Sequence, residues 1–254
     1  MKGTCLITGA SSGIGAALAR KFADQEFNLI ISGRDQTSLN EVRQTFANPD
    51  SAQIVTADLS KPEGASHLIA EVEKLRLPVD ILVNNAGIIL RGNLNDHSIA
   101  DIEDLLQVNT QSLTRLTHHF LPGMITRDCG RILNVASVAA FQPIPGMDIY
   151  AASKAYVLSL SESLSEQLRG TGVSVTVLCP GVTRTRSTEQ LADALPSLLV
   201  SSPDEVAEEG FEAVMARETI RIPGAPNKTA VMLSQLQPRS ITRRIGGILS
   251  RLSP

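Results

Sequence analysis

The sequence predicts a single α/β domain whose doubly wound parallel sheet is covered by helices on both faces. Two observations indicate this fold class. Short β-branched runs alternate with longer helical patterns along most of the 254 residues. In addition, runs such as residues 80–83 and 173–178 are mostly apolar, as expected for strands between two layers of helices. Because no Pro/Gly-rich linker interrupts the alternation, we expect one domain over residues 1–225.

The expected strands are short, and helices lie between them. The strands cover residues 3–8, 27–32, 52–57, 80–84, 130–136, 173–179 and 219–222. The helices cover residues 13–25, 35–47, 61–76, 98–121, 148–170 and 203–217. Right-handed crossovers between such strands make the sheet parallel. We expect a lid at about residues 183–200 and an amphipathic, basic tail at residues 226–254.

Composition and charge exclude several classes of protein. The net charge of −3 favours neither nucleic-acid binding nor specialisation for acidic substrates. The longest apolar runs are the length of a strand, so we expect no transmembrane helix. The first expected strand begins within a few residues of Met1, so we expect no targeting peptide. Three scattered cysteines lack metal-ligand spacing, so we expect no metal, a reducing compartment and a cytoplasmic location.

A glycine-rich turn follows the first expected strand. Residues 4–7 are β-prone, residues 8–15 form the turn, and a helical stretch begins at Ala16. Glycines let a backbone approach a pyrophosphate closely, and the new helix presents N–H groups and its positive dipole end to the phosphates. The spacing is Gly-x-x-x-Gly-x-Gly rather than the commoner Gly-x-Gly-x-x-Gly. We therefore predict dinucleotide binding, with a plain tight turn as the alternative. The expected phosphate contacts are Gly9, Ser11, Ser12, Gly13, Ile14 and Gly15.

A tyrosine and a lysine stand four residues apart in one expected helix. Tyr150 and Lys154 would project from the same face of that helix, one turn apart, and Ser137 lies upstream. A phenol has a reference pKa of about 10, and an ammonium beside it favours the phenolate. Together with a serine hydroxyl, such a pair can move a proton on or off a carbonyl or alcohol oxygen. The alternative is an ordinary surface pair at helical spacing.

Several of these candidates fall where expected strands end. In doubly wound sheets, ligands bind beyond the carboxyl ends of the strands. The residues at these ends are Gly9, Gly33, Asp58, Asn84, Ser137 and Pro180. This coincidence supports a single site at one edge of the sheet.

In these motifs the chain resembles the short-chain dehydrogenase/reductase family. The match runs in order through residues 8–15, Asp58, residues 84–87, Asn109, Ser137, Tyr150, Lys154 and Pro180-Gly181, and so covers residues 1 to about 185. The resemblance implies a Rossmann fold, NAD or NADP as hydride carrier, and a homodimer or homotetramer. It also implies a catalytic tetrad of Asn109, Ser137, Tyr150 and Lys154.

The resemblance assigns a role to each member of this tetrad. Tyr150 would deliver a proton to the carbonyl oxygen, and Ser137 would orient that oxygen. Lys154 would lower the pKa of Tyr150 and hold the nicotinamide ribose hydroxyls. Asn109 falls inside the expected helix 98–121, where asparagine is unusual. By the resemblance it sits at a helix kink and holds a water in a proton relay toward the lysine.

Further cofactor contacts are implied beyond the glycine-rich turn. Asp58 and Leu59 resemble the pair that contacts adenine, although Asp58 could instead cap the helix expected near Lys61. The remaining implied contacts are Asn85, Ala86 and Gly87 beside the cofactor, Pro180, Gly181 and Thr183 near the nicotinamide carboxamide, and the catalytic pair Tyr150 and Lys154.

The end of the second strand favours NADP over NAD. An acidic residue there normally binds the ribose hydroxyls of NAD, whereas an arginine accommodates the 2′-phosphate of NADP. Here Ser32 and Gly33 end the strand, Arg34 comes next, and Asp35 follows. Arg34 can contact a phosphate in bidentate fashion. Asp35 could either cap the next helix or compete for the ribose.

The expected substrate pocket is largely apolar. Its predicted residues are Ile88, Ile89, Leu90, Phe141, Ile144, Pro145 and Met147, with Leu191, Leu195, Leu198 and Leu199 in the lid. An apolar pocket suits a hydrophobic ketone, aldehyde or alcohol, although ordinary core packing is the alternative. Arg184 and Arg186 could engage an anionic substrate or simply face solvent.

We therefore predict an NADP-dependent oxidoreductase that transfers a hydride between the nicotinamide and a carbonyl or secondary alcohol, with Tyr150 as general acid and base. The alternatives are a non-catalytic dinucleotide-binding redox sensor and a 3-oxoacyl-thioester reductase. The tail after Pro223 departs from the closing segment of the 3-oxoacyl-carrier-protein reductases. We expect the tail to dock on its own domain or a sister subunit, with peripheral membrane contact as the alternative.

Overall fold

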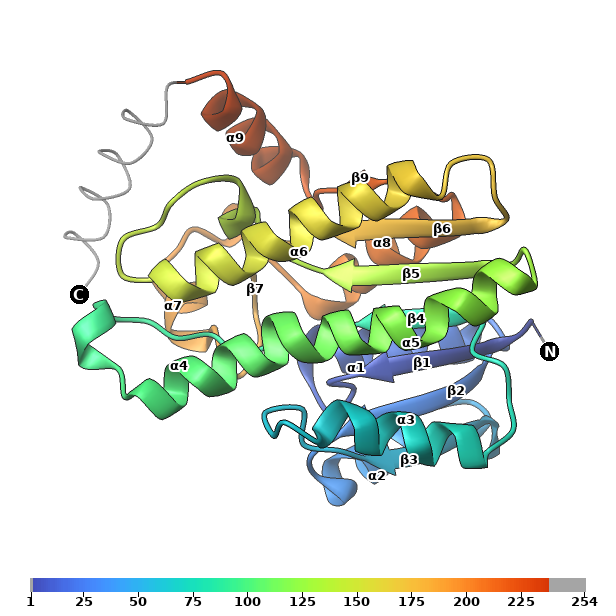
Figure 1. Cartoon of the computed structure of the whole chain (residues 1–254). Coiled ribbons are helices and arrows are strands. Elements are labelled where there is room, and N and C mark those ends of the chain that lie inside the picture. The colour runs from blue at the N-terminus through green and yellow to red at the C-terminus, as the bar shows by residue number, and fades with distance from the viewer. Residues whose placement is uncertain (1, 238–254) are drawn as a thin grey trace.

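The computed structural model describes residues 2–237 and contains a seven-stranded, all-parallel sheet (Figure 1). The strand order is β3-β2-β1-β4-β5-β6-β9. The strands are β1 (Thr4–Thr8), β2 (Asn28–Gly33), β3 (Ala52–Thr56), β4 (Ile81–Asn84), β5 (Gly130–Val135), β6 (Val173–Leu178) and β9 (Ile220–Arg221). The predicted doubly wound α/β fold is confirmed, and all seven predicted strands are present. The order changes direction between β1 and β4, which is where such sheets bind ligands.

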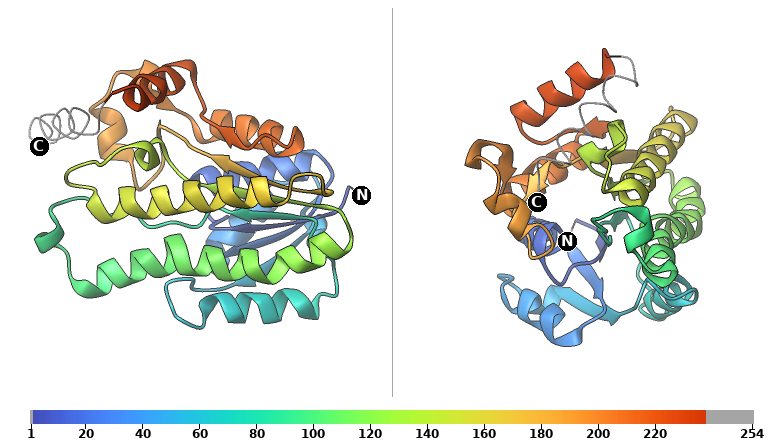
Figure 2. Two further views of the ribbon diagram at one scale, coloured as in Figure 1. Left: turned by 45° about the horizontal axis from the view of Figure 1, so that its top comes forward. Right: turned by 90° about the vertical axis from the view of Figure 1, so that its left-hand side faces the viewer.

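Helices cover both faces of the sheet. One face carries α1 (Gly13–Asp24), α2 (Gln36–Gln44) and α8 (Pro203–Met215). The other face carries α3 (Gly64–Lys74), α4 (Ile99–Leu106), α5 (Leu113–Thr126) and α6 (Asp148–Gln167). Figure 2 shows α3, α5 and α6 side by side in cyan, green and yellow on that second face.

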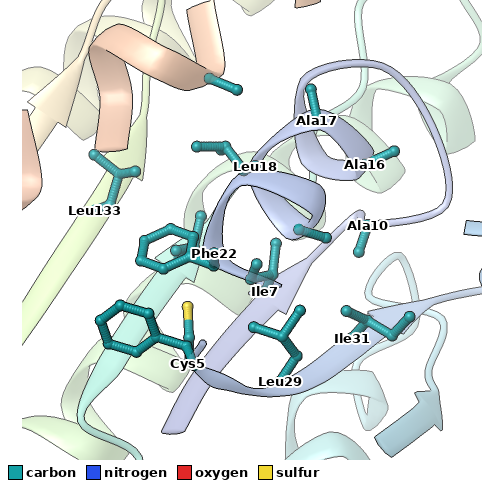
Figure 3. Packing of buried hydrophobic residues seen from close by; sticks show 14 of the residues in the cluster. Cys5, Ile7, Ala10, Ala16, Ala17, Leu18, Phe22, Leu29, Ile31 and Leu133 are labelled. Carbon is teal, nitrogen blue, oxygen red and sulfur yellow. The ribbon is translucent and has the colours of Figure 1, made fainter. Parts of the chain in front are cut away.

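The hydrophobic core beneath α1 fixes the start of this helix. Leu18 and Phe22 of α1 belong to one buried cluster with Ile7 of β1 and Leu29 of β2 (Figure 3), and all four side chains are buried. Each fully buried side chain of this size contributes about 1.5–3 kcal/mol to the stability. Phe22 also meets Phe211 of α8 edge to face, with ring centroids 5.0 Å apart. The glycine-rich turn before α1 therefore rests on a rigid base.

The expected helix 98–121 is interrupted where the sequence held an asparagine. Between α4 and α5, residues Gln107–Ser112 form a π-helical turn that contains Asn109. Such turns occur often at functional sites. The helix also continues past the predicted end, since α5 includes Pro122 and ends at Thr126.

The predicted lid segment and the C-terminal segment contain elements that the sequence did not predict. In the predicted lid segment, β7 (Val182–Thr183) pairs with β8 (Val200–Ser201), and between them lie α7 (Glu189–Asp193) and a 3-10 turn at Ser197–Leu199. Helix α9 (Ala225–Gln235) packs against this 3-10 turn and against a second one at Val138–Phe141. The predicted tail 226–254 thus begins in α9, and its part beyond residue 237 lies outside the described residues. Within residues 2–237, no helix combines the length and apolar character needed to cross a bilayer.

A chain of buried polar side chains links the sheet to two helices of the second face, α5 and α6. Asn84 Nδ2 donates to Asn134 Oδ1 at 2.9 Å and to Thr117 Oγ1 at 3.1 Å. Asn134 Nδ2 in turn donates to Ser161 Oγ at 2.9 Å. Because these groups are shielded from water, each is costly to leave without a partner.

The Asn134→Ala variant is therefore expected to lower the free energy of unfolding by about 2–4 kcal/mol. Urea denaturation measures this change. Thr176→Val is the matched control, because the buried Thr176 hydroxyl has no hydrogen-bond partner within residues 2–237. The control is expected to leave stability unchanged or to raise it by about 1 kcal/mol. An equal loss of unfolding free energy in the two variants would show that the hydrogen bonds of Asn134 do not contribute to stability.

Candidate functional site

One cleft lies across the carboxyl ends of the strands. In Figure 1 these strand ends point to the left. Its position coincides with the change of strand direction between β1 and β4. Every residue predicted to bind the dinucleotide lines this cleft: Gly9, Ser11, Ser12, Gly13, Ile14, Gly15, Arg34, Asp58, Leu59, Asn85, Ala86, Gly87, Tyr150, Lys154, Pro180, Gly181 and Thr183. Of the four predicted catalytic residues, Ser137 also lines it and Asn109 does not.

The glycine-rich turn is shaped as a phosphate cradle. Gly9 and Gly13 adopt φ values of +65° and +55°, a region that side chains disfavour. A Cβ on Gly15 would overlap the carbonyl oxygen of Gly9, so the turn and the first turn of α1 touch without a gap. Ser12 precedes α1 without a side-chain capping bond, which leaves the first N–H groups of the helix without a side-chain cap. This arrangement suits a pyrophosphate.

The residues after β4 are tied to this turn by hydrogen bonds. The backbone N–H groups of Asn85 and Ala86 both donate to Thr8 Oγ1 at 3.1 Å. Asn85 Nδ2 donates to the carbonyl oxygens of Thr8 at 2.9 Å and Gly9 at 3.1 Å. The Asn85 side chain therefore stabilises the floor of the cleft and uses its amide donors on the protein backbone.

After β2, the acidic side chain of Asp35 faces the start of α2. Asp35 caps α2, accepting from the N–H groups of Thr37 and Ser38 at 3.2 and 3.0 Å. The Ser38 hydroxyl, which also donates to this carboxylate, lowers the pKa of Asp35 most, and the two N–H groups lower it further. Arg34 is exposed and lines the cleft. Ser32 is buried there, and its hydroxyl has no partner within residues 2–237.

Asp58 does not cap a helix, contrary to the alternative considered from the sequence. Its Oδ1 accepts from the backbone N–H of Ser60 at 3.1 Å in a local turn, and α3 begins only at Gly64. Asp58 and Leu59 instead line the cleft beside β3.

Tyr150, Ser137 and Lys154 meet at the inner end of the cleft. Tyr150 and Lys154 lie in the first turns of α6 and are 8 % and 5 % exposed. Lys154 Nζ donates to the carbonyl oxygen of Val135 at 2.8 Å and lies 5.7 Å from the centroid of the Tyr150 ring. Ser137 follows β5, and its hydroxyl accepts from the N–H of Ala139 at 3.1 Å.

The electrostatics of this pair differ from the expectation that Lys154 lowers the pKa of Tyr150. Burial raises the pKa of Tyr150, and the opposing contributions come from Ser137 and from the positive charge of Arg91. Burial also lowers the pKa of Lys154 to about 8. The reason is that both side chains leave water, which disfavours the charged form of each.

The Asn109 side chain joins two segments behind the cleft by hydrogen bonds. Its Oδ1 accepts from the N–H of Ile88 at 2.8 Å, and its Nδ2 donates to the Ile88 carbonyl and to Ser153 Oγ, both at 3.0 Å. The side chain is 1 % exposed. The π-helical turn thus joins the segment after β4 to helix α6, which carries Tyr150 and Lys154.

The predicted lid segment presents polar side chains to the cleft rather than the predicted leucines. Thr185, Ser187 and Thr188 line the cleft, and a Cβ on Gly13 would lie 3.0 Å from Thr185 Cγ2. The predicted leucines Leu191, Leu195, Leu198 and Leu199 are not among the lining residues, and Leu198 is 80 % exposed. The run of threonines and serines after Pro180-Gly181 was the available signal in the sequence.

On the side expected to hold the substrate, the apolar residues are partly as predicted. Ile88 and Ile89 line the cleft. Leu90, Ile144 and Met147 pack in the same cluster as Tyr150, whereas Phe141 packs in a different cluster, with Val177 and Cys179. Among the predicted anion-binding arginines, Arg184 forms an ion pair with Asp193 at 2.5 Å.

The comparisons with known proteins agree with one another. A family model described as short chain dehydrogenase matches residues 3–196. Ketoacyl reductase HetN of Nostoc sp. is 32 % identical over 249 residues, covering 94 % of this chain and 87 % of its own.

Two solved structures are similar over nearly the whole chain. A structure of a 7β-hydroxysteroid dehydrogenase has a TM-score of 0.86 at 28 % identity and covers 96 % of both chains. A short-chain dehydrogenase from Sphingobium yanoikuyae in complex with NADPH has a TM-score of 0.78 at 31 % identity, covering 92 % of this chain and 96 % of that one.

Proposed function

Because this chain belongs to the short-chain dehydrogenase/reductase family of NAD(P)-dependent enzymes, we propose that it uses NADP to reduce the carbonyl group of an apolar ketone or aldehyde. The observation that carries this proposal is the meeting of Tyr150, Ser137 and Lys154 in a cleft that also holds the glycine cradle. The cradle, whose tight turn has no room for a Cβ on Gly15, fits a dinucleotide. When bound, the cofactor supplies the hydride.

The protein's own residues would handle the proton and the orientation. The raised pKa keeps the Tyr150 phenol protonated at neutral pH, which is the form that a general acid needs. The Ser137 hydroxyl would hydrogen-bond the same carbonyl oxygen and hold it against Tyr150. Lys154, with a pKa of about 8, is mainly an ammonium at pH 7 and would bind the ribose hydroxyls. These protonation states favour the reductive direction.

Asn109 is proposed as a positioning residue. Its amide fixes Ile88 on one side and Ser153 of α6 on the other. It would therefore keep the wall of the cleft at a constant distance from the helix that carries Tyr150 and Lys154. The water relay that the family resemblance implies would have to reach Lys154 around these hydrogen bonds of Asn109.

The choice of NADP rests on the end of β2. Asp35 is engaged as the cap of α2, which leaves Arg34 as the charged group of this segment that lines the cleft. Two polar groups lie nearby: the Ser32 hydroxyl, which has no hydrogen-bond partner in the described part of the chain, and the Ser11 side chain, which lies 3.4 Å from the place of a Cβ on Gly33. Arginine and hydroxyl groups together suit a 2′-phosphate.

The Arg34→Ala variant is expected to weaken NADPH binding by about ten- to a hundredfold, because it removes a charge-assisted contact, and to change NADH binding by less than about twofold. Enhancement of nicotinamide fluorescence measures both affinities. Asp35→Ala is the control, and it should lower stability slightly without changing the preference. Wild-type preference for NADH would reverse the assignment.

A second candidate substrate is a 3-oxoacyl thioester. The similarity to a protein named ketoacyl reductase supports it, and the same three residues could reduce such a carbonyl. The segment from Pro223 into α9 departs from the closing segment expected of that branch. Steady-state rates with a 3-oxoacyl thioester and with a simple ketone decide between the two.

The third alternative is a dinucleotide sensor without catalysis. Such a sensor would not need a protonated phenol in the cleft. By the family resemblance we further propose that the protein forms a homodimer or homotetramer.

A further inference from the structure

Among residues 2–237, one arginine without a side-chain partner follows the apolar segment that packs against the proposed proton donor. Arg91 follows the apolar segment Ile88–Leu90 and is exposed. Within residues 2–237, it forms no ion pair and no side-chain hydrogen bond. In the same region, Asp96 accepts hydrogen bonds from Asn93 and Asn95. Asp148 is exposed at the start of α6 and forms no ion pair with Arg91.

The backbone around Arg91 is held in place from both sides. On one side, both backbone polar groups of Ile88 are bonded to Asn109. On the other side, the N–H of Gly92 donates to the carbonyl of Gly146 at 2.9 Å, and these glycines have φ values of +127° and +79°. Three residues span at most about 10 Å, so Arg91 cannot move far from the cleft wall.

The apolar cluster below Arg91 includes the proposed proton donor. Ile88, Ile89 and Leu90 pack with Tyr150, and Ile144 joins them from the loop that contains Gly146. Arg91 follows this apolar segment directly, and its positive charge opposes the rise in the pKa of Tyr150 that burial causes. One stretch of chain therefore carries both an apolar wall that packs against the proton donor and a cation in the next residue.

We infer that Arg91 is a specificity-determining residue that binds an anionic group, such as a carboxylate, carried by the substrate away from its reacting carbonyl. This inference rests on the proposed function of the same site. An oxo acid would place its carbonyl at Tyr150, its apolar part along Ile88 and Ile89, and its carboxylate at the guanidinium, which can bind it in bidentate fashion. The carbonyl carbon gains a hydride from NADPH and the oxygen gains a proton, so the oxo acid becomes a hydroxy acid and NADPH becomes NADP⁺.

The test compares linear oxo acids of increasing chain length with their methyl esters, which have the same carbonyl and no charge. For at least one length, the wild type is expected to reduce the acid with a kcat/KM about tenfold or more above that of the ester. Arg91→Gln should lower kcat/KM for that acid by about thirty- to a hundredfold and change the ester by less than about threefold. Arg91→Lys should restore part of the loss.

The Arg217→Gln variant is a matched control, because Arg217 is also exposed and follows α8 at the opposite edge of the sheet. It should change neither substrate. Equal losses for acid and ester in Arg91→Gln would show that Arg91 acts only on Tyr150 and would overturn the inference, as would no loss at all.

A binding measurement keeps the inference separate from the proposed function. Saturated carboxylic acids of the same lengths, which lack a carbonyl, are titrated calorimetrically into the full chain with NADP⁺ present. Binding that Arg91→Gln weakens about tenfold or more supports the inference even if no substrate turns over. Binding that is absent, or equal in both proteins, refutes it even if a neutral ketone is reduced with NADPH.

Discussion

The Tyr150→Phe variant is expected to lose carbonyl reduction almost completely, with kcat lowered by about a thousandfold or more. A general acid contributes on the order of a hundred- to ten-thousandfold, and phenylalanine cannot donate a proton. The ring itself is kept, so its packing with Leu105 and Ala151 is unchanged. NADPH affinity is therefore expected to change by less than about twofold, measured by nicotinamide fluorescence beside the steady-state rate.

The chain contains a matched control for this variant. Tyr156 is the one other tyrosine, and it lies on the same helix with its hydroxyl 2.8 Å from Thr114 Oγ1. It is 43 % exposed and does not line the cleft of Tyr150. Tyr156→Phe should retain wild-type turnover. Normal turnover by Tyr150→Phe, or an equal loss in both variants, would refute the assigned role.

The Gly15→Ala variant is expected to weaken binding of NADPH and NADH alike by about thirtyfold or more. The new methyl group would overlap the carbonyl of Gly9 and the side chain of Asn85, so the turn before α1 must open. An opened turn no longer presents its N–H groups together, and overpacking of this kind costs about 1–3 kcal/mol of stability. Fluorescence titration and thermal unfolding measure the two effects.

Gly123→Ala in α5 is the control for the glycine substitution. There the methyl group would meet only the movable end of Arg127, 3.3 Å away, inside a helix. Replacing a glycine within a helix by alanine is expected to raise stability by about 0.5–1 kcal/mol without affecting the cofactor. If Gly15→Ala behaves like this control, the turn does not form the phosphate cradle.

The features that the sequence predicted well are those set by short-range patterns. The strand, glycine-rich turn and helix over residues 4–24 follow from local periodicity and from glycine, and the structure contains them in that order. Capping by Asp35 was one of two alternatives that the sequence left open, and it depends only on Thr37 and Ser38, two and three residues away. The carboxyl ends of parallel strands share one edge of the sheet. The sequence therefore also predicted that the residues at these ends would line one cleft.

The features that it missed depend on contacts between distant residues. Helical spacing places Tyr150 and Lys154 on one face, but it does not reveal that Lys154 donates to the carbonyl of Val135. The position of Arg91 depends on the bond from Gly92 to Gly146, which lies on another loop. The polar lining of the lid depends on how Thr185 returns to Gly13.

The C-terminal segment shows the same limit of local patterns. The sequence placed a tail after residue 225, and the structure contains α9 there. Asn227 in α9 donates to the carbonyl of Pro223, and its side chain lies 2.5 Å from the place of a Cβ on Gly181. The start of α9 therefore supports Pro180 and Gly181 at the cleft. No local pattern in the sequence predicts this contact.

The most direct test of the proposed function is the fate of the transferred hydrogen. NADPH carrying deuterium at the transferable position of the nicotinamide is incubated with the purified protein and a panel of apolar ketones, aldehydes and oxo acids. The proposed function predicts that wild-type protein yields an alcohol with one added deuterium on the former carbonyl carbon, and that Tyr150→Phe yields almost none. An alcohol without the label, or equal labelling by both proteins, would contradict hydride transfer at a site where Tyr150 supplies the proton.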